Sequence, residues 1–432
     1  MNEYDTNRIY DLVGQINYKK TTNLNEADCY ILNTCHIREK ATDKVYHDVG
    51  RVKKNFRNKK KPIIIVSGCV AQAEGEILLD REKYIDAVVG PQSYQHLNNI
   101  ILNLEKKILK KITSTNFETI DKFDTLNSIK NSSNKISSFL TIQEGCDKFC
   151  KFCVVPYTRG AEYSRSSLEI SNECKNLVSN GAREITLIGQ NVNAYYYEKK
   201  KLSDLIKEIS TIENLKRIRY TTSHPRDFTN DLIEAHGEVK NLMPLIHLPV
   251  QTGSNKILKL MNRKHTIEEY LNIIEKLRKI NPTIKFSSDF IIGYPGESED
   301  DFNETINLLK EVQFINCYSF IYSPRPGTPA ATMRKVDINI AKERLNIFQK
   351  CAEKIKLNFR KDLLNKNSSV LFENNINGKR EFFGKDEFSN SVIVKSDKDI
   401  KGKIENVKIV GGNQNSLYGE INKKLSKEYF AA

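Results

Sequence analysis

The alternation of apolar and polar positions divides the chain into regions with different expected folds. Up to about Ile112, short apolar runs alternate with polar segments of helical character such as residues 38–55. The runs are Cys29 to Leu32, Ile63 to Val66 and Ile85 to Val89. This alternation predicts a small α/β domain with a parallel sheet over residues 1–112. The following residues 113–134 are rich in Ser, Asn, Asp and Lys, which predicts a linker.

Residues 135–362 alternate more regularly. The strand candidates are SSFLTIQEG, EITLIGQN, RIRYTTS, LIHLPVQ, KFSSDFIIGY and NCYSFIYS, separated by helix-like segments. Six such units are too few for the usual eight-stranded barrel, so we expect an open, partial parallel barrel. Ser298 followed by Asp301 predicts a capping box at a helix start. Residues 365–425 lack a helical period and predict a small all-β barrel or sandwich.

Polar and glycine residues gather where these expected strands end. They are Cys146 after the first strand, Gln190 and Asn191 after the second, Ser223 after the third, Gln251 after the fourth, and Gly293, Gly296 and Glu297 after the fifth. Any one of them could be a turn or cap residue. Active sites of βα architectures lie at the carboxyl ends of the strands, however, so the succession favours one shared site.

Composition excludes some classes of protein and leaves others open. Hydrophobic residues make up 39% and charged residues 28% of the chain, and no apolar run approaches the roughly 20 residues of a membrane span. We therefore expect a cytoplasmic protein, monomeric by default, with no membrane partner. The net charge of +14 suits RNA, although a genome biased towards Lys explains the charge about equally well. In a reducing cytosol, the nine cysteines are metal ligands, catalytic groups or buried apolar residues rather than disulfide partners.

The segment GCDKFCKFCVVPYTRG places Cys146, Cys150 and Cys153 at C-x3-C-x2-C spacing. Cubane clusters generally have four cysteine ligands, so three thiolates leave one iron of a 4Fe-4S cluster open to a small molecule. Structural zinc is the alternative, with a distant ligand such as His224 or His247 completing the usual four. We expect Cys174, Cys317 and Cys351 to be packing residues.

This cysteine spacing in a six-unit partial barrel resembles the radical S-adenosylmethionine (SAM) superfamily. The segments NTCHIREKA, VSGCVAQ, LIGQNVNAY, TTSHPRDF, HLPVQTGS, MNRKHT, DFIIGYPGE and YSPRPGTPAA narrow the resemblance to its methylthiotransferase family. The match is nearest to the branch that makes 2-methylthio-N6-isopentenyladenosine in tRNA.

The resemblance implies a radical 4Fe-4S cluster on Cys146, Cys150 and Cys153, and SAM as cofactor. It also implies an auxiliary 4Fe-4S cluster on Cys35 and Cys69, which carries the sulfur to be inserted. Residues 365–425 resemble an RNA-binding TRAM domain. The candidate SAM contacts are the polar and glycine residues at the strand ends: Gln190, Asn191, Ser223, Gln251, Gly293, Gly296 and Glu297.

The implied reaction is methylthiolation of C2 of the adenosine at position 37, next to the anticodon. The expected partners are the tRNA anticodon loop, an electron donor such as flavodoxin or ferredoxin, and iron–sulfur assembly or sulfur donor proteins. Arg159, Arg165, Arg325 and the Lys-rich C-terminal region are candidates for phosphate contacts, although a solvated face explains any one of them more readily. Tyr157 or Tyr294 could stack on the base or could simply pack in the core. Two alternatives stay open: methylthiolation of another modified adenosine or of a ribosomal protein, and a non-catalytic, metal-stabilised RNA-binding protein.

The chain departs from the family pattern at its start. The family's auxiliary cluster uses three cysteines, the first in a GCQMN motif, whose last two letters match Met1 and Asn2. The first cysteine and the first strand are therefore missing from the sequence as written. We expect a start codon assigned too far downstream; the alternative is a truncated chain with weak or absent sulfur insertion and retained SAM cleavage.

Overall fold

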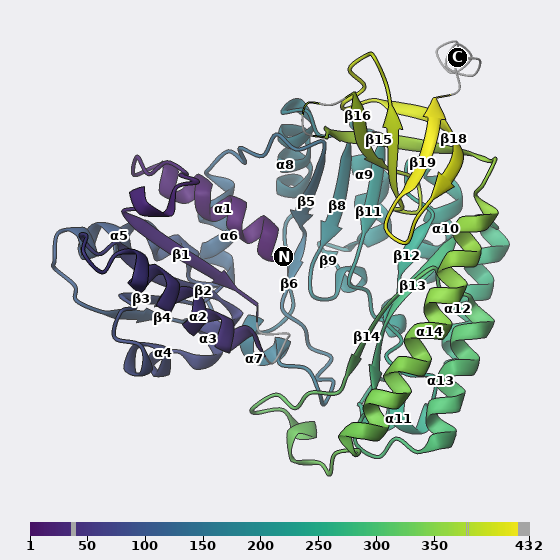
Figure 1. The fold of residues 1–432 in the computed structure, drawn as a ribbon, viewed down its shortest axis with the longest axis horizontal. Coiled ribbons are helices and arrows are strands. Elements are labelled where there is room, and N and C mark those ends of the chain that lie inside the picture. The colour runs from purple at the N-terminus through teal and green to yellow at the C-terminus, as the bar shows by residue number, and fades with distance from the viewer. Residues whose placement is uncertain (36–39, 377, 379, 422–432) are drawn as a thin grey trace.

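The computed structural model describes residues 1–35, 40–376, 378 and 380–421 of the chain. It contains an N-terminal α/β domain, a central set of parallel strands and a C-terminal β-barrel (Figure 1). Residues 36–39 of the NTCHIREKA motif and residues 422–425 of the expected TRAM domain lie outside the described residues. Within the described part, no helix has the length and apolar character needed to cross a membrane.

The N-terminal domain is a parallel sheet covered by helices on both faces, as the sequence predicts. Its strands, in spatial order, are β1 (Cys29–Thr34), β2 (Ile63–Gly68), β3 (Ala87–Val89) and β4 (Ile112–Ser114). Its helices are α1 (Asn2–Gly14), α2 (Lys40–Asn55), α3 (Cys69–Glu74), α4 (Glu76–Arg81) and α5 (Leu97–Glu105). Ile65 of β2 packs into one apolar cluster, and its neighbours Ile64 and Val66 pack into another. Successive strand residues point to opposite faces, so burial of both faces explains the continuous apolar run.

The segment expected to be a linker contains a packed helix instead. Helix α6 (Thr119–Asn127) buries Phe123 and Leu126 in the same cluster as Leu12 of α1. Strand β4 also extends into this segment and pairs with β3. The expectation of a plain linker is wrong for these residues, because two apolar side chains three positions apart form a buried helical face despite the polar composition.

The central region contains the expected strands in the expected order. They are β5 (Ser137–Thr141), β8 (Glu184–Ile188), β11 (Arg217–Tyr220), β12 (Leu245–His247), β13 (Lys285–Ile292) and β14 (Asn316–Ile321). Parallel pairing joins β5, β8 and β11 into one sheet and β12, β13 and β14 into another. A parallel bridge between Ile218 and Leu242 links the two sheets. The sheets thus form the expected open, partial barrel.

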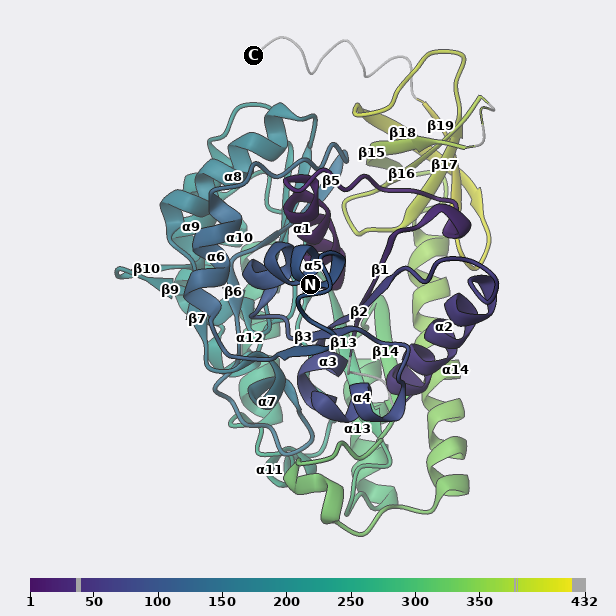
Figure 2. The ribbon, with the colours of Figure 1, turned by 90° about the vertical axis from the view of Figure 1, so that its left-hand side faces the viewer.

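Helices cover the outside of this partial barrel (Figure 1). They are α8 (Ser167–Ser179), α9 (Leu202–Ser210), α10 (Asn230–Glu238), α11 (Asn255–Leu260), α12 (Ile267–Ile280), α13 (Glu299–Val312) and α14 (Ile338–Asp362). In the view of Figure 2, α8 and α9 lie on one flank and α14 on the other. The predicted capping box is present at the start of α13, where Ser298 and Asp301 bond each other's backbone N–H. Cys174 of α8, Cys317 of β14 and Cys351 of α14 pack in or against the central apolar cluster, as expected.

The C-terminal strands form a closed barrel, which resolves the choice between barrel and sandwich. In spatial order they are β15 (Asn367–Asn375), β16 (Glu381–Lys385), β17 (Ser391–Lys395), β19 (Leu417–Ile421) and β18 (Ile404–Gly412). Two buried arginines of β11 attach this barrel to the amino ends of the central strands. Arg217 donates to the carbonyl oxygen of Ser369 over 2.7 Å, and Arg219 donates to that of Glu387 over 2.9 Å.

Candidate cluster and cofactor site

Cys146, Cys150 and Cys153 lie in the loop between the short strand β6 (Gln143–Glu144) and helix α7 (Val155–Arg159). The loop begins at Gly145, whose φ of 77° suits glycine and whose position leaves no room for a Cβ beside the carbonyl oxygen of Ala161. The backbone N–H of Gly145 donates to the side chain of Gln190 over 2.7 Å. The loop is thereby fixed to the carboxyl end of β8.

The three cysteines of this loop are buried or partly buried. Burial raises the pKa of Cys146 to about 12, and the charges of Cys153 and Cys150 add to the rise. Burial likewise raises the pKa of Cys153 to about 11. At neutral pH these two groups are protonated thiols, so binding of a metal requires the release of protons.

Buried polar atoms without partners lie on the segments after β8 and β11 and on the segment between α11 and α12. The Oδ1 of Asn191, the Oγ of Ser223 and both ring nitrogens of His265 find no hydrogen-bond partner among the described residues. The amide nitrogen of Asn191 donates to Asp227 over 2.7 Å, and Lys148 of the cysteine loop pairs with the same carboxylate. Buried polar atoms are normally hydrogen-bonded, so a polar ligand fits this place.

Side-chain positions in the structure do not by themselves outline a metal site. Among residues 1–35, 40–376, 378 and 380–421, no group of three or more His, Cys, Asp and Glu side chains is gathered closely enough to hold a metal ion. The fit to a 4Fe-4S cluster therefore rests on the donor set. Soft thiolates are the ligands that iron–sulfur clusters select, and this loop offers three beside polar atoms that lack partners.

Of the candidate SAM contacts, Gln251 bridges to β13 in the segment after β12, and Gly293, Gly296 and Glu297 form the turn after β13. Gln251 has a φ of 77°, and its backbone N–H donates to the carbonyl oxygen of Asp289 over 3.0 Å. The backbone N–H of Gly293 donates to the carboxylate of Glu297, which also pairs with Arg344 over 3.0 Å. Glu297 thus closes the turn and ties it to α14, and Gly296 provides a φ of 89° within it.

Cys35 and Cys69 directly follow neighbouring parallel strands of the N-terminal sheet. Thr34, the last residue of β1, is paired in register with Gly68, the last residue of β2. Gly68 has a φ of 89° and leads into α3, which begins at Cys69. The two cysteines therefore leave the sheet side by side at its carboxyl edge, where a shared ligand would lie.

Arg159 connects the two cysteine regions. It ends α7, just beyond the loop of Cys153, and its Nε donates to the sulfur of Cys69 over 3.4 Å. Its Nη atoms pair with Asp5 at 2.8 Å and Glu144 at 3.3 Å. The guanidinium is 2% exposed, so it is inaccessible to an RNA phosphate.

Arg159, Arg165 and Tyr294 do not have the surface positions that the sequence suggested. Arg165 is fully buried and paired with Glu173 at 2.8 Å, so the expectation of phosphate contacts is wrong for both arginines. Tyr294 is also fully buried, which excludes stacking on a base, whereas Tyr157 is 50% exposed. These arginines are buried and pair with carboxylates that the fold brings beside them. A single sequence does not reveal such pairs.

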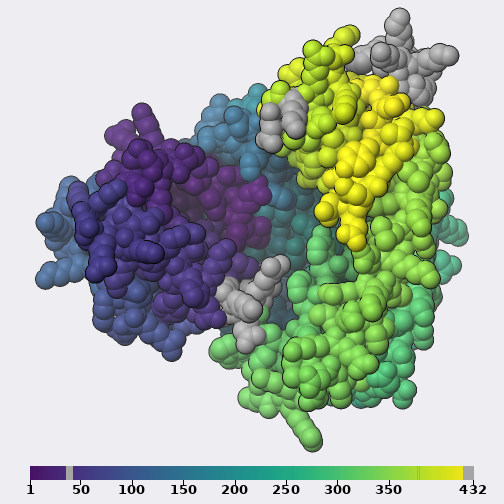
Figure 3. Space-filling model, viewed as in Figure 1, coloured from purple at the N-terminus to yellow at the C-terminus, as the bar shows by residue number. Residues whose placement is uncertain are grey.

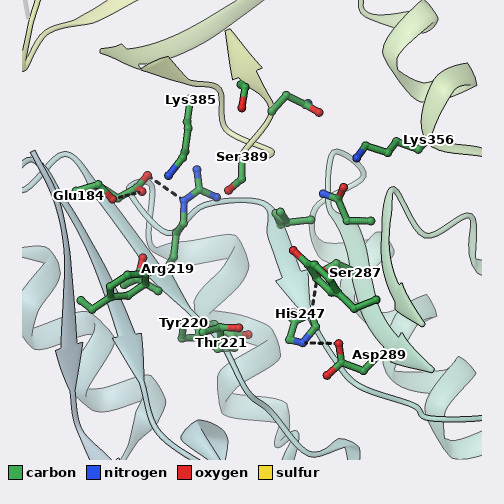
Figure 4. Close-up of a pocket in the computed structure, with 18 of the residues that line it drawn as sticks. Glu184, Arg219, Tyr220, Thr221, His247, Ser287, Asp289, Lys356, Lys385 and Ser389 are labelled. Atoms are coloured by element: carbon green, nitrogen blue, oxygen red, sulfur yellow. Dashed lines mark hydrogen bonds and ion pairs between the residues drawn. The ribbon is translucent and has the colours of Figure 1, made fainter. Parts of the chain in front are cut away.

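A separate cavity of about 610 Å³ lies between the central strands and the C-terminal barrel (Figure 4). Its lining includes an ion pair between Arg219 and Glu184 at 2.9 Å. Lys356 and Lys385 also line it. The cavity is nearer to the amino ends of the central strands, whereas the cysteine loop follows their carboxyl side. Figure 3 shows a hollow on the face of the molecule between the N-terminal domain and α14 with the C-terminal barrel.

Two family models match the chain. Residues 140–309 match the radical SAM superfamily, and residues 1–90 match a family described as uncharacterized protein family UPF0004. The tRNA-2-methylthio-N(6)-dimethylallyladenosine synthase of Pelagibacter ubique is 57% identical over 99% of this chain and 97% of its own length. The chain therefore belongs to the tRNA-2-methylthio-N(6)-dimethylallyladenosine synthase family. The synthase of Wolbachia pipientis is 49% identical over 97% of this chain and 97% of its own length. The synthase of Rickettsia canadensis is 48% identical over 98% of this chain and 97% of its own length.

Solved structures show the same fold as this member of the synthase family. A radical SAM methyltransferase, TsrM, from Kitasatospora setae, with cobalamin and a 4Fe-4S cluster bound, superposes with a TM-score of 0.53. It is 12% identical and covers 74% of this chain and 68% of its own. The cobalamin-dependent radical SAM enzyme OxsB has a TM-score of 0.52 at 13% identity, and covers 81% of this chain and 53% of its own.

Sequence reasoning assigned no role to Asn262 and Arg263, which contact the cysteine loop in this synthase-family chain. Asn262 donates to the carbonyl oxygen of Phe149, and Arg263 donates to the sulfur of Cys150. Both residues belong to the MNRKHT segment, which supports only the family resemblance. The available signal was an Asn-Arg pair directly after a helix that ends at the carboxyl side of the strands.

Proposed function

We propose that the chain is a radical SAM tRNA methylthiotransferase. In this proposal it converts N6-isopentenyladenosine at position 37 of tRNA to 2-methylthio-N6-isopentenyladenosine. The observation that carries the proposal is the cysteine loop after β6, which lies beside buried polar atoms of Asn191, Ser223 and His265 that lack partners. The names of relatives 57%, 49% and 48% identical over nearly the whole chain support the same activity.

We assign the radical cluster to Cys146, Cys150 and Cys153, whose three thiolates leave one iron for SAM. When bound and reduced, this cluster supplies the electron that cleaves SAM to a carbon-centred radical. The chain's residues provide position and exclusion of water. Asn191 and Ser223 offer buried oxygens to the polar groups of SAM, and Gln190 fixes the start of the loop through the N–H of Gly145. Gln251, Gly293, Gly296 and Glu297 shape the neighbouring turns.

We assign Cys35 and Cys69 to a second 4Fe-4S cluster, which would carry the sulfur to be inserted. Their positions after the paired residues Thr34 and Gly68 support a shared ligand. The hydrogen bond from Arg159 to Cys69 supports an orientation of that ligand towards the cysteine loop of the central barrel.

The tRNA is proposed to bind in the hollow between the N-terminal domain and the C-terminal barrel, which we interpret as a TRAM domain. Lys356 and Lys385 line the cavity between the central strands and the C-terminal barrel and suit phosphate contacts, and the net charge of +14 favours a polyanion. An anticodon loop presents unpaired bases that can leave their stack at low cost.

We further propose that the protein acts as a cytoplasmic monomer. Its helper proteins would be an electron donor, such as flavodoxin or ferredoxin, and iron–sulfur assembly or sulfur donor proteins.

Anaerobic reconstitution tests the radical cluster. The wild-type chain should be brown, contain four irons per radical site and form 5′-deoxyadenosine from SAM on reduction. Cys146→Ala, Cys150→Ala and Cys153→Ala should each lose SAM cleavage, while Cys351→Ala, in α14, should retain it. A colourless protein that contains zinc would favour the non-catalytic RNA-binding alternative.

Nucleoside analysis tests the substrate. A strain that lacks the gene should accumulate N6-isopentenyladenosine and lose its 2-methylthio derivative in total tRNA. Unchanged tRNA nucleosides, together with loss of methylthiolation on another modified adenosine or a ribosomal protein, would move the assignment to another branch of the methylthiotransferases.

A further inference from the structure

The turn of residues 261–263, which follows α11, is bonded to the cysteine loop at three successive residues. The carbonyl oxygen of Met261 accepts from the backbone N–H of Lys151 over 2.9 Å. The side-chain amide of Asn262 donates to the carbonyl oxygen of Phe149 over 3.0 Å. Nη1 of Arg263 donates to the sulfur of Cys150 over 3.7 Å.

These contacts hold a strained part of the loop. Phe149 has a φ of 47°, in the left-handed region that residues with a Cβ rarely adopt. The hydrogen bond from Asn262 to its carbonyl oxygen stabilises that conformation. The turn thereby fixes the path of the chain on the amino side of Cys150.

Arg263 is a buried cation without a carboxylate partner among the described residues. It is 7% exposed, and its Nη2 donates to the carbonyl oxygen of Pro249 over 2.5 Å, while its Nε has no partner there. The neighbouring rings of His224 and His265 do not compensate its charge, since imidazole is neutral or cationic. A buried, uncompensated charge is costly, so this place favours a bound anion.

We propose that Arg263 is a positioning residue for the radical cluster: it orients the Cys150 ligand and places a fixed positive charge beside the bound cluster. The inference rests on the proposed assignment of Cys146, Cys150 and Cys153 as cluster ligands. Reduction adds one electron to a group that is already anionic and breaks no bond. A nearby guanidinium stabilises the reduced state more than the oxidised state, so it raises the reduction potential.

The test is a redox titration of the reconstituted full chain with a low-potential one-electron reductant such as europium(II), followed by electron paramagnetic resonance. Arg263→Gln removes the charge, and Arg263→Lys keeps it. Arg380→Gln is the control, because Arg380 is 82% exposed on the C-terminal barrel. Iron per chain is measured for every variant.

We expect Arg263→Gln to lower the midpoint potential at unchanged iron content, Arg263→Lys to restore most of the shift, and Arg380→Gln to match the wild type. The role of the Arg263 charge would be overturned if Arg263→Gln had the same midpoint potential as the wild type. It would also be overturned if the Gln and Lys variants shifted the potential equally. Either result leaves the proposed function standing. If Arg263→Gln binds no iron, the midpoint potential of Arg263→Lys decides the question. A potential equal to that of the wild type supports the positioning role of Arg263, and a lowered potential overturns it. A wild-type chain that forms no four-iron cluster would overturn both proposals.

Discussion

Arg159 donates from its Nε to the sulfur of Cys69 over 3.4 Å and thereby joins the central cysteine loop to the first residue of α3. The guanidinium is held on its other side by Asp5 and Glu144, both buried. Lys122 of α6 pairs with the same Glu144 over 2.6 Å. These contacts fix the relative placement of the two proposed cluster sites.

Replacement of Arg159 should destabilise the junction of the two domains. Arg159→Gln leaves the buried carboxylates of Asp5 and Glu144 with Lys122 as the side-chain cation that pairs with both. The amide of Gln92 also donates to Glu144, but it carries no charge. Removal of one partner from a buried ion pair costs about 3–5 kcal/mol, so we expect a loss of that order in the free energy of unfolding. Urea unfolding followed by circular dichroism measures it. Arg380→Gln, which removes an exposed pair with Asp397, should change the urea midpoint little.

Helix α6 should contribute to the stability of the N-terminal domain. Phe123→Ala removes a fully buried ring and should lower the free energy of unfolding by about 3–5 kcal/mol. Ile120→Ala on the same helix is the control, because Ile120 is 58% exposed and should cost far less. Equal effects of the two substitutions in urea unfolding would mean that α6 does not pack as the structure describes.

The turn at Gly293 should reject a side chain. Gly293 has a φ of 70°, and an added Cβ would lie 2.7 Å from the Cβ of Ala341 in α14. Gly327 is the matched control, with a φ of 80° and no heavy atom within 4 Å of an added Cβ. Both alanine variants bear backbone strain, but Gly293→Ala should lose roughly 1–3 kcal/mol more through overlap with α14. Comparison of their melting temperatures by differential scanning calorimetry tests this difference.

His236 should make the central barrel sensitive to mild acid. Burial lowers its pKa from 6.5 to about 3 in the folded chain, where its ring bonds the hydroxyl of Tyr220. As the pH falls below 6.5, the unfolded state takes up a proton that the folded state does not bind. His236 alone should therefore contribute a fall in stability of roughly 1.4 kcal/mol per pH unit until the pH approaches 3. The buried His224 and His265, whose pKa values burial also lowers, add to the fall in both the wild type and a His236 variant.

Urea unfolding of the wild type and of His236→Gln at pH 7.5 and 5.5 checks this expectation. The wild type should lose more stability than the variant between the two pH values. His47→Gln, at an exposed position on α2, should lose as much as the wild type. A His236→Gln variant with the same pH dependence as the wild type would contradict the assignment.

The sequence predicts those features that depend on local pattern. The apolar runs locate the central strands, and Ser298 and Asp301 locate the start of α13, because capping involves residues three apart. The position of Cys146 after a strand also follows from local pattern. Helix α6 was missed because polar residues surround Phe123 and Leu126, although their spacing was a readable signal.

Contacts between distant segments were beyond prediction from one sequence. Arg159 and Arg165 look like surface cations until Asp5, Glu144 and Glu173 are placed beside them by the fold. The contact of Arg263 with Cys150 likewise joins residues 113 positions apart. Such pairs depend on tertiary placement, which composition and periodicity do not encode.

The attachment of the C-terminal barrel has an evolutionary consequence. Arg217 and Arg219 reach across to main-chain carbonyl oxygens of Ser369, Asp386 and Glu387. Every amino acid provides such an oxygen, so the joint tolerates exchange of the side chains that face it. Selection can therefore alter the exposed side chains of that barrel while both halves of the molecule stay in fixed alignment.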